Sequence, residues 1–300
     1  MEQIGIDVGG TSLKAGLVRP DGTIARRTQR PLQYSGGEAF AATLAEMAAE
    51  VAGDSPPGGI GSVGIGIPGA VDGGTVLHTE NIPMRNLPLA QMVRKHLDLP
   101  VYLGNDADCA AVGEYLFGCG RGTRNFVLVT LGTGIGGGLI LGGRLYRGQS
   151  CAGEVGCMVI DRTGDPGSWE SLGSATGLIA MASRAREAVP ESLLWSEALN
   201  GRTIFAAAER QDAAACAVIR EYTACLGVGL TNLTDILMPD VIAVGGGVSA
   251  APEQLLLEPV RQYVRTHCYG RHIGQFPRIL RAELGNDAGI VGAALLGSVL

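Results

Sequence analysis

Glycine-rich turns that follow apolar strands are the feature that most constrains the fold of this chain. Its 300 residues include 47 glycines, which form neither a collagen period nor a low-complexity tract and therefore mark tight turns and close backbone approaches. A glycine turn after a strand lets backbone N–H groups face phosphate oxygens without an intervening side chain. Three such turns follow predicted strands, at residues 9–10, 132–138 and 245–247.

These turns do not belong to the common nucleotide-binding motifs. The letters of the dinucleotide fingerprint G-x-G-x-x-G occur at residues 64–69 and 132–137, but the first copy contains Pro68 and the second runs into a predicted strand at residues 139–141. A Rossmann motif needs a helix at that point. The sequence has no GxxxxGK[ST] motif, which excludes a P-loop.

Apolar strands alternate with helical stretches along the chain. The order strand, glycine turn, strand occurs at residues 4–18 and again at residues 126–141, and this weak internal repeat predicts two similar lobes with a boundary near residues 118–122. Other expected strands are residues 62–67, 101–103 and 241–244, and the expected helices are residues 40–51, 89–97, 107–116, 253–265 and 288–300.

Composition limits the partners of the chain. With 46% hydrophobic residues, 17% charged residues and a formal net charge of −6, it can build a large core but has no basic cluster for a polyanion such as DNA. Its start shows no secretion signal, and the apolar run at residues 126–143 is rich in glycine, which favours strand–turn–strand over a membrane span. Seven cysteines without a CxxC pair indicate free thiols in a reducing compartment. We therefore expect a cytoplasmic protein that binds neither nucleic acid nor a membrane.

Four segments carry a more specific resemblance because they occur together and in one order. They are residues 4–11 (IGIDVGGT), 104–107 (GNDA), 131–138 (LGTGIGGG) and 153–156 (GEVG). With the turn at residues 245–247, they resemble the phosphate-1, phosphate-2 and adenosine segments of the actin/hexokinase/Hsp70 superfamily. In detail they resemble the ROK family of bacterial sugar kinases and sugar-responsive repressors, over essentially the whole chain.

The resemblance implies an α/β protein with a two-lobed, ribonuclease H-like fold and a cleft between the lobes. It implies an N-terminal lobe of residues 1–118, with residues 287–300 packing back on it, and a C-terminal lobe of residues 119–286. It also implies ATP and Mg²⁺ as cofactors, a small sugar as substrate and a homodimer.

The same resemblance assigns roles to individual residues. Asp7 would help to hold the magnesium ion and its waters, and Asp106 would be the catalytic base. The positions that would bind the nucleotide are Gly9, Gly10, Thr11, Lys14, Gly132, Thr133, Gly134, Gly245 and Gly246. The positions that would bind the sugar, besides Asp106, are Gly69, Asn81, Asn105, Glu154, Cys157 and Glu170.

The position of Asp106 agrees with a base on chemical grounds. Phosphoryl transfer needs positioning, a metal ion and an acceptor for the proton of the attacking hydroxyl. The start of the expected helix at Ala107 would favour the charged form of a carboxylate there. The alternative is that Asn105 or Asp106 only caps this helix, and the two roles can coexist.

Two features of the ROK pattern are missing. Family members usually carry a histidine at the position of Cys157, which contacts the sugar, and soon afterwards a Cys-x-Cys-Gly-x-x-Gly-Cys zinc loop. Residues 161–168 contain no cysteine and end in Ser168, where that motif ends in cysteine. Since structural zinc takes about four nitrogen or sulfur ligands, we expect no zinc site.

Residues 169–178 (WESLGSATGL) resemble the corresponding stretch of glucokinase-type members. We therefore expect transfer of the γ-phosphoryl group of ATP to the 6-hydroxyl of glucose. Fructose, N-acetylmannosamine, allose and β-glucosides remain alternative acceptors. A repressor is disfavoured because the first strand begins at Ile4, and a sensor that binds ATP and sugar without turnover is disfavoured because Asp7 and Asp106 are both present.

Overall fold

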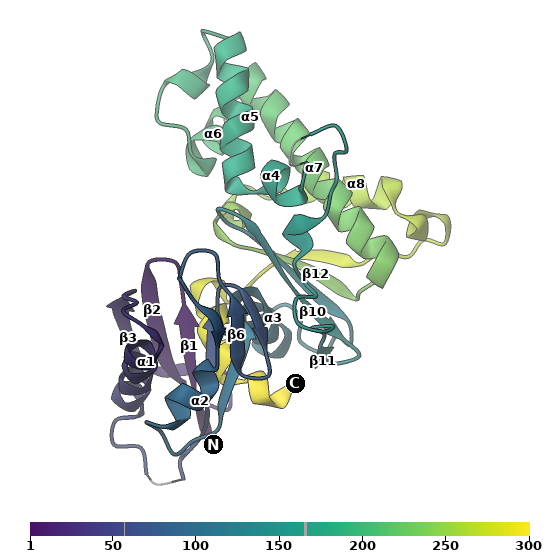
Figure 1. Ribbon diagram of the computed structural model, residues 1–300. Helices are drawn as coiled ribbons and strands as arrows, with labels where there is room; N and C mark the ends of the chain where they lie inside the picture. The colour runs from purple at the N-terminus through teal and green to yellow at the C-terminus, as the bar shows by residue number, and fades with distance from the viewer. Residues whose placement is uncertain (57, 165–166) are drawn as a thin grey trace. The chain divides into compact units, whose positions relative to one another are not determined.

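The structure, a computed structural model, describes residues 1–56, 58–164 and 167–300 (Figure 1). Contacts between residues divide the chain into two units. Unit 1 consists of Met1–Arg124, Gly138–Gly153 and Glu283–Leu300, and unit 2 consists of Asn125–Gly137 and Glu154–Ala282. The lobe limits expected after residue 118 and before residue 287 stay a prediction.

Unit 1 is built on a five-stranded sheet with the strand order β3-β2-β1-β4-β8. β1 pairs antiparallel with β2, whereas β1, β4 and β8 run parallel. The sequence of β4 is a nearly continuous apolar run because parallel strands are covered on both faces. A smaller antiparallel sheet has the order β5-β6-β7. The strands are β1 (Glu2–Val8), β2 (Ser12–Val18), β3 (Ile24–Pro31), β4 (Ile60–Ile67), β5 (Ala70–Asp72), β6 (Thr75–His78), β7 (Arg85–Leu87) and β8 (Val101–Asn105).

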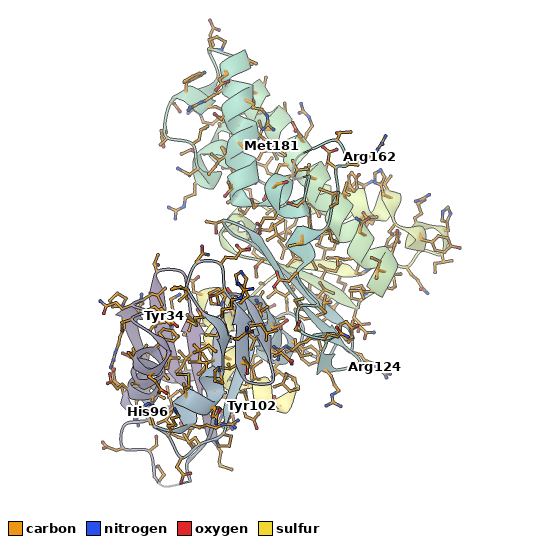
Figure 2. All side chains as sticks on the ribbon, viewed as in Figure 1. Tyr34, His96, Tyr102, Arg124, Arg162 and Met181 are labelled. Atoms are coloured by element: carbon orange, nitrogen blue, oxygen red, sulfur yellow. The ribbon has the colours of Figure 1, made fainter. Side chains whose placement is uncertain are left out.

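Amphipathic helices cover the sheet of unit 1. In α1, Phe40, Leu44, Met47 and Val51 recur at helical spacing and are buried. Tyr34, labelled in Figure 2, packs edge-on against Phe40 with ring centroids 5.6 Å apart. The helices expected at residues 40–51, 89–97 and 107–116 are confirmed, with slightly different ends, as α1 (Gly37–Ala52), α2 (Leu89–Arg94) and α3 (Asp106–Phe117).

The late helix α9 (Ala288–Ala294) also belongs to unit 1, where Figure 1 shows it in yellow. Its backbone lies directly on the sheet. A Cβ atom on Gly5 of β1 would be 1.8 Å from the carbonyl oxygen of Ile290, and one on Gly64 of β4 would be 1.7 Å from that of Ala293. These two glycines therefore allow the helix to approach the sheet more closely than side chains would permit.

Helix α3 crosses α9 at the same close range. A Cβ on Gly113 of α3 would lie 2.5 Å from the carbonyl oxygen of Ala288. The single helix expected at residues 288–300 is shorter in the structure: α9 ends at Ala294, and a 3-10 turn follows at Leu296–Ser298. The turn packs on Tyr102 of β8, labelled in Figure 2, whose ring occupies the space that a side chain at Gly297 would fill.

The second sheet has the order β11-β10-β9-β12-β13, in which β12 runs parallel to both β9 and β13. The glycine turn expected at residues 132–138 is shorter than predicted, because β10 already begins at Ile135 and takes the later glycines into strand pairing. Strand β10 passes from unit 2 to unit 1 between Gly137 and Gly138. The strands are β9 (Phe126–Leu131), β10 (Ile135–Leu141), β11 (Arg144–Leu145), β12 (Val241–Gly245) and β13 (Arg278–Arg281).

The indole of Trp169 is fully buried and packs against α7 in unit 2. Its Nε1 donates to the carbonyl oxygen of Cys225 at 3.1 Å, and Gly229 of α7 leaves room for the ring. The helix expected at residues 253–265 starts later, at Leu257. The helices are α4 (Trp169–Gly173), α5 (Ala175–Ala188), α6 (Gly201–Glu209), α7 (Ala213–Leu237) and α8 (Leu257–His267).

Within the described residues, α7 is the helix whose length and composition would allow it to cross a membrane. However, 56% of its most apolar window is buried inside the protein, and the core helix of a soluble protein meets the same criterion. Its length and apolar composition are therefore weak evidence for a membrane span.

Candidate active site

The carboxyl ends of three parallel strands bring the candidate residues of unit 1 to one edge of its sheet. Asp7 of β1 is in register with Gly66 of β4, and Gly66 with Gly104 of β8. Asp106 follows β8 directly, as the first residue of α3. Strands two positions apart are separated by about 10 Å, and ligands of α/β proteins bind at the carboxyl ends of strands. The structure therefore brings together the two acids that the sequence singles out.

The pKa of the buried Cys109 thiol is raised partly by the negative charges of the same acids. Burial raises its pKa well above the ordinary value, and the negative charges of Asp108, Asp106 and Asp7 raise it further. Both site acids thus act on one buried atom of α3. The thiol itself is kept protonated and inert by this environment.

The carboxylate of Asp7 is partly withdrawn from water. Burial raises its pKa, and the ammonium group of Lys14, opposite it on β2, acts in the other direction. The backbone of Gly289 in α9 lies close to this carboxylate, since a Cβ on Gly289 would be 3.1 Å from the carboxyl carbon of Asp7. A nearby cation stabilises the charged form of a desolvated carboxylate, and Mg²⁺ prefers oxygen ligands. Asp7 therefore fits the predicted metal role.

The turn after β1 presents its backbone to solvent. The N–H of Gly9 donates to the carbonyl oxygen of Ser12 at 2.9 Å, and the N–H of Leu32 donates to that of Thr11 at 2.9 Å. Gly10 and Thr11 are exposed, and no atom lies within 4 Å of a Cβ position on Gly10. This turn is held at both ends and open between them, as a phosphate-binding turn needs to be.

Asn105 is the residue that caps α3. Its Oδ1 accepts hydrogen bonds from the N–H groups of Ala107 at 2.8 Å and Asp108 at 3.2 Å, and its Nδ2 donates to the carbonyl oxygen of Gly69 at 3.2 Å. Asp106 Oδ1 accepts a local hydrogen bond from the adjacent Ala107 N–H at 2.9 Å. Asn105 is thus the N-cap of α3, and its side chain also links Gly69 to the start of this helix.

Asn81 lies in an exposed turn between β6 and β7 of unit 1. The buried hydroxyl of Thr79 donates to the carbonyl oxygen of Ile82 and accepts from the N–H of Met84 at 3.4 Å. These bonds fix the turn that carries Asn81. Its contact to a sugar stays a prediction.

In unit 2, the turn between β9 and β10 is held from the start of α5. The N–H of Gly132 donates to the carbonyl oxygen of Gly134 at 2.9 Å. The N–H of Ala175 donates to the carbonyl oxygen of Gly132 at 2.8 Å, and the hydroxyl of Thr176 donates to that of Thr133 at 2.9 Å. Thr133 is exposed at the tip of this fixed turn.

The side chain of Glu170 in α4 contacts this turn, and the sequence did not indicate this contact. Its Oε2 accepts a hydrogen bond from the N–H of Ile135 at 2.8 Å, and a Cβ on Gly134 would lie 2.3 Å from the same oxygen. Glu170 follows the buried Trp169 in α4, which fixes its position while leaving its side chain exposed. The carboxylate therefore connects a candidate sugar residue with the candidate phosphate turn.

Glu154 directly precedes a short 3-10 helix, Val155–Cys157, which Cys157 ends, and both residues are exposed. Gly156 brings this helix against the turn, because a Cβ on it would lie 2.3 Å from the carbonyl oxygen of Ile135. Glu154, Cys157 and Glu170 therefore lie near the beginning of β10, and their contact with a sugar stays a prediction.

Gly245 and Gly246 lie where β12 ends, beside the end of β9. Gly245 is in register with Thr130. Gly246 has a φ of 81°, and a Cβ there would lie 2.4 Å from the carbonyl oxygen of Leu131. Both the left-handed conformation and the close approach require glycine. The candidate adenosine residues thus adjoin the strand that leads into the turn at residues 132–134.

Asp108 and Arg147 form a buried ion pair in unit 1 that sequence analysis missed. Arg147 Nε lies 3.6 Å from Asp108 Oδ2, and Arg147 Nη2 donates to the carbonyl oxygen of Val71 at 2.5 Å. The pair connects the first turn of α3 with β5. An acid inside an apolar helical stretch was the available signal, but its partner is distant in sequence.

The described residues contain no group of three or more histidine, cysteine, aspartate or glutamate side chains that could hold a metal ion. Cys151 and Cys157 are exposed thiols. Two residues of the loop compared with the zinc motif, Asp165 and Pro166, lie outside the described residues. The absence of zinc stays a prediction.

Comparison with known proteins agrees with the resemblance. The chain is 36% identical to a glucokinase of Streptomyces coelicolor, over 97% of this chain and 96% of that protein. It is 34% identical to a glucokinase of Halalkalibacterium halodurans, over 98% and 94%. A ROK family glucokinase from Streptomyces griseus, solved in complex with glucose and AMPPNP, has a TM-score of 0.81 and 35% identity over 99% of both chains.

These neighbours confirm the predicted fold class, that of the actin/hexokinase/Hsp70 superfamily. The model of the ROK family matches residues 3–298. With this match over nearly the whole chain, and with relatives of 34–36% identity over the same length, the protein belongs to the ROK family.

Proposed function

We propose that this hexokinase-type phosphotransferase transfers the γ-phosphoryl group of ATP to the 6-hydroxyl of glucose. The observation that carries the proposal is the shared strand edge of unit 1, which holds Asp7 at the end of β1 and Asp106 just after β8. The similarity to glucokinases supports glucose as acceptor. The similarity to a structure that contains AMPPNP supports ATP as donor.

Asp7 is the residue that would hold Mg²⁺ indirectly, through the waters of the ion. Its raised pKa, caused by burial, means that a cation at this position relieves an unfavourable charge. An ion held there would supply positive charge that offsets the negative charge of the phosphate oxygens. The exposed backbone of Gly10 and Thr11 would donate to the same phosphates, and Lys14 would add positive charge beside them.

Asp106 would accept the proton of the attacking hydroxyl. The proton leaves only as the oxygen bonds to phosphorus, so an ordinary carboxylate is a sufficient base. Asn105 supports this role because its bonds to Ala107, Asp108 and Gly69 fix the first turn of α3. A base held in this way can keep its place beside the sugar.

Unit 2 carries further residues that are predicted to bind the nucleotide or the sugar. Thr133 and Gly134, in a turn fixed by α5, would contact the β- and γ-phosphates, and Gly132 would shape that turn. Gly245 and Gly246 would lie against the adenosine. Glu154, Cys157 and Glu170 would face sugar hydroxyls, as would Gly69 and Asn81 of unit 1. A thiol is a weak hydrogen-bonding group, so Cys157 would contribute little to sugar affinity.

We also propose a homodimer in the cytoplasm that contains no structural zinc. The other acceptors to be compared with glucose are fructose, N-acetylmannosamine, allose and a β-glucoside. A sensor without turnover would bind ATP and a sugar but release no ADP.

The deciding experiment measures sugar-dependent ADP release with Mg-ATP for each of these acceptors. We expect the highest kcat/KM with glucose, and a product that glucose-6-phosphate dehydrogenase oxidises. Release with another hexose alone would retain the kinase and change the sugar. ADP release with no sugar at all, or only with a non-sugar acceptor, would refute the proposal.

A further inference from the structure

Glu114 is a fully buried acid of α3 with no part in the site described above. Its Oε1 accepts a hydrogen bond from the N–H of Leu284 at 2.6 Å. Its Oε2 accepts from the N–H groups of Glu283 at 3.0 Å and Cys119 at 3.3 Å. Burying a carboxylate is costly unless such bonds compensate. The fold uses this group to attach residues 283 and 284 to α3.

The attached segment leads directly into α9. A 3-10 turn, Gly285–Asp287, joins the two, and the N–H of Asp287 donates to the carbonyl oxygen of Leu284 at 3.1 Å. Arg27 of β3 also holds this turn, because its Nη1 and Nη2 each donate to the Asp287 carboxylate at 2.7 Å. That pair is solvent-exposed and therefore weak, which leaves Glu114 as the buried anchor of the segment.

The first turn of α9 lies behind Asp7. A Cβ on Gly289 would be 3.1, 3.3 and 3.4 Å from the three carboxyl atoms of Asp7. The neighbour of Glu114 in sequence, Gly113, meets the same turn at the carbonyl oxygen of Ala288. A short series of contacts therefore runs from the Glu114 carboxylate, through residues 284–289, to the Asp7 carboxylate, and all of it lies in unit 1.

We propose that Glu114 is a positioning residue for Asp7, because it sets how closely the start of α9 backs the Asp7 carboxylate. Loosening residues 283 and 284 lets Gly289 move away and leaves Asp7 free to turn from its metal-binding position. The affinity for the magnesium form of the nucleotide then falls, while the affinity for the metal-free nucleotide does not. This inference rests on the proposed role of Asp7 in holding Mg²⁺.

A purely structural role for Glu114 is the competing explanation. The close contacts of α9 with Gly5 and Gly64 could hold the helix without Glu114. In that case the three hydrogen bonds would stabilise the fold and leave Asp7 unaffected. The two explanations differ in the ratio of nucleotide affinities with and without magnesium, which general destabilisation does not change.

The test compares Glu114→Gln with Glu283→Gln. The first variant replaces one accepting oxygen by an NH₂ group, which cannot accept from a backbone N–H. The second removes an exposed charge from the same segment but keeps its N–H groups bonded to Glu114. Calorimetry measures AMPPNP affinity with Mg²⁺ and with EDTA, and hydrogen exchange measures the amides of residues 283–289.

For Glu114→Gln we expect faster exchange at residues 283–289 and Mg-AMPPNP affinity weakened about 10-fold, a loss typical for residues that orient metal ligands. Affinity for AMPPNP in EDTA should stay unchanged. Glu283→Gln should match the wild type in all three measurements. Faster exchange without a change in the affinity ratio, or equal weakening with and without Mg²⁺, would overturn the proposal.

If Glu114→Gln does not fold, Leu284→Pro removes the shortest of the three bonds from the other side. The φ of Leu284, −81°, is close to the value that proline requires. This variant should show the same selective loss of Mg-AMPPNP affinity, and an unchanged ratio would again count against Glu114. A wild-type protein that binds AMPPNP equally well with and without Mg²⁺ would instead refute the metal role of Asp7 itself.

Discussion

Replacement of Asp106 by asparagine separates chemistry from helix capping in this protein. The cap of α3 is supplied by Asn105, through bonds of 2.8 and 3.2 Å to the N–H groups of Ala107 and Asp108. Asp106→Asn leaves that cap intact, and its amide oxygen can still accept from the N–H of Ala107. Loss of one negative charge in the first turn of α3 should cost about 0.3–1 kcal/mol of stability.

The rate should change much more than the stability. General base catalysis contributes roughly 10²–10⁴-fold, which corresponds to about 3–5 kcal/mol of transition-state stabilisation. The amide cannot take the proton from the sugar hydroxyl, so this loss should appear in kcat with little change in KM for glucose or ATP. Steady-state ADP release measures both constants, and urea denaturation measures the stability of the same preparation.

Asn105→Asp is the matched control. A carboxylate caps a helix about as well as the amide does, but it cannot donate to the carbonyl oxygen of Gly69. We expect a stability loss of about 1 kcal/mol and a moderate rise in KM for glucose. If Asp106→Asn keeps close to full kcat, the reasoning is refuted, and the proton acceptor must be Glu154 or a phosphate oxygen of ATP.

The remaining predictions concern stability, sugar affinity and zinc. Burial raises the pKa of Asp7 in the folded state, so stability is lost as the pH rises through that pKa. Asp7→Asn should therefore raise the melting temperature of the nucleotide-free protein at neutral pH and much less at low pH. A melting temperature below that of the wild type at neutral pH would contradict this. Gly246→Ala should cost roughly 2 kcal/mol or more in urea denaturation, because of its φ of 81° and its contact with Leu131, whereas Gly247→Ala, with no atom within 4 Å, should cost far less. Cys157→His should strengthen glucose binding by about 1–3 kcal/mol in calorimetry, and unchanged or weaker binding would show that this loop has repacked. Elemental analysis should find no stoichiometric zinc, and about one ion per chain that survives chelation would contradict the inference from the missing cysteine loop.

The sequence predicted best what depends on local backbone chemistry. The turn after Val8 and the turn at residues 132–134 follow strands as expected, because glycine placement and strand periodicity are both local signals. The prediction that the glycines after Ile135 belong to a turn is wrong. Strand pairing holds them extended in β10, and no local pattern distinguishes a glycine in a turn from one in a paired strand.

Acids that bind distant backbone could not be predicted in the same way. Glu114 contacts residues 283 and 284, and Glu170 contacts Ile135, so both roles depend on which segments the fold brings together. The sequence also could not decide between Asn105 and Asp106 as the cap, since both carry an oxygen that can accept from a helical N–H. Only the observed geometry assigns that bond to Asn105.

During synthesis on the ribosome, unit 1 is completed only when its last helix, α9, has been translated. The first 124 residues supply all five strands of its main sheet, but α9 emerges only after the whole of unit 2 has been translated. At typical rates of translation this delay is on the order of ten seconds. Throughout that time the patch around Gly5 and Gly64 lacks its cover, and the apolar partners of Ile290 and Val291, such as Val18, face water. The nascent chain therefore offers a chaperone an apolar sheet surface that the finished protein hides beneath α9.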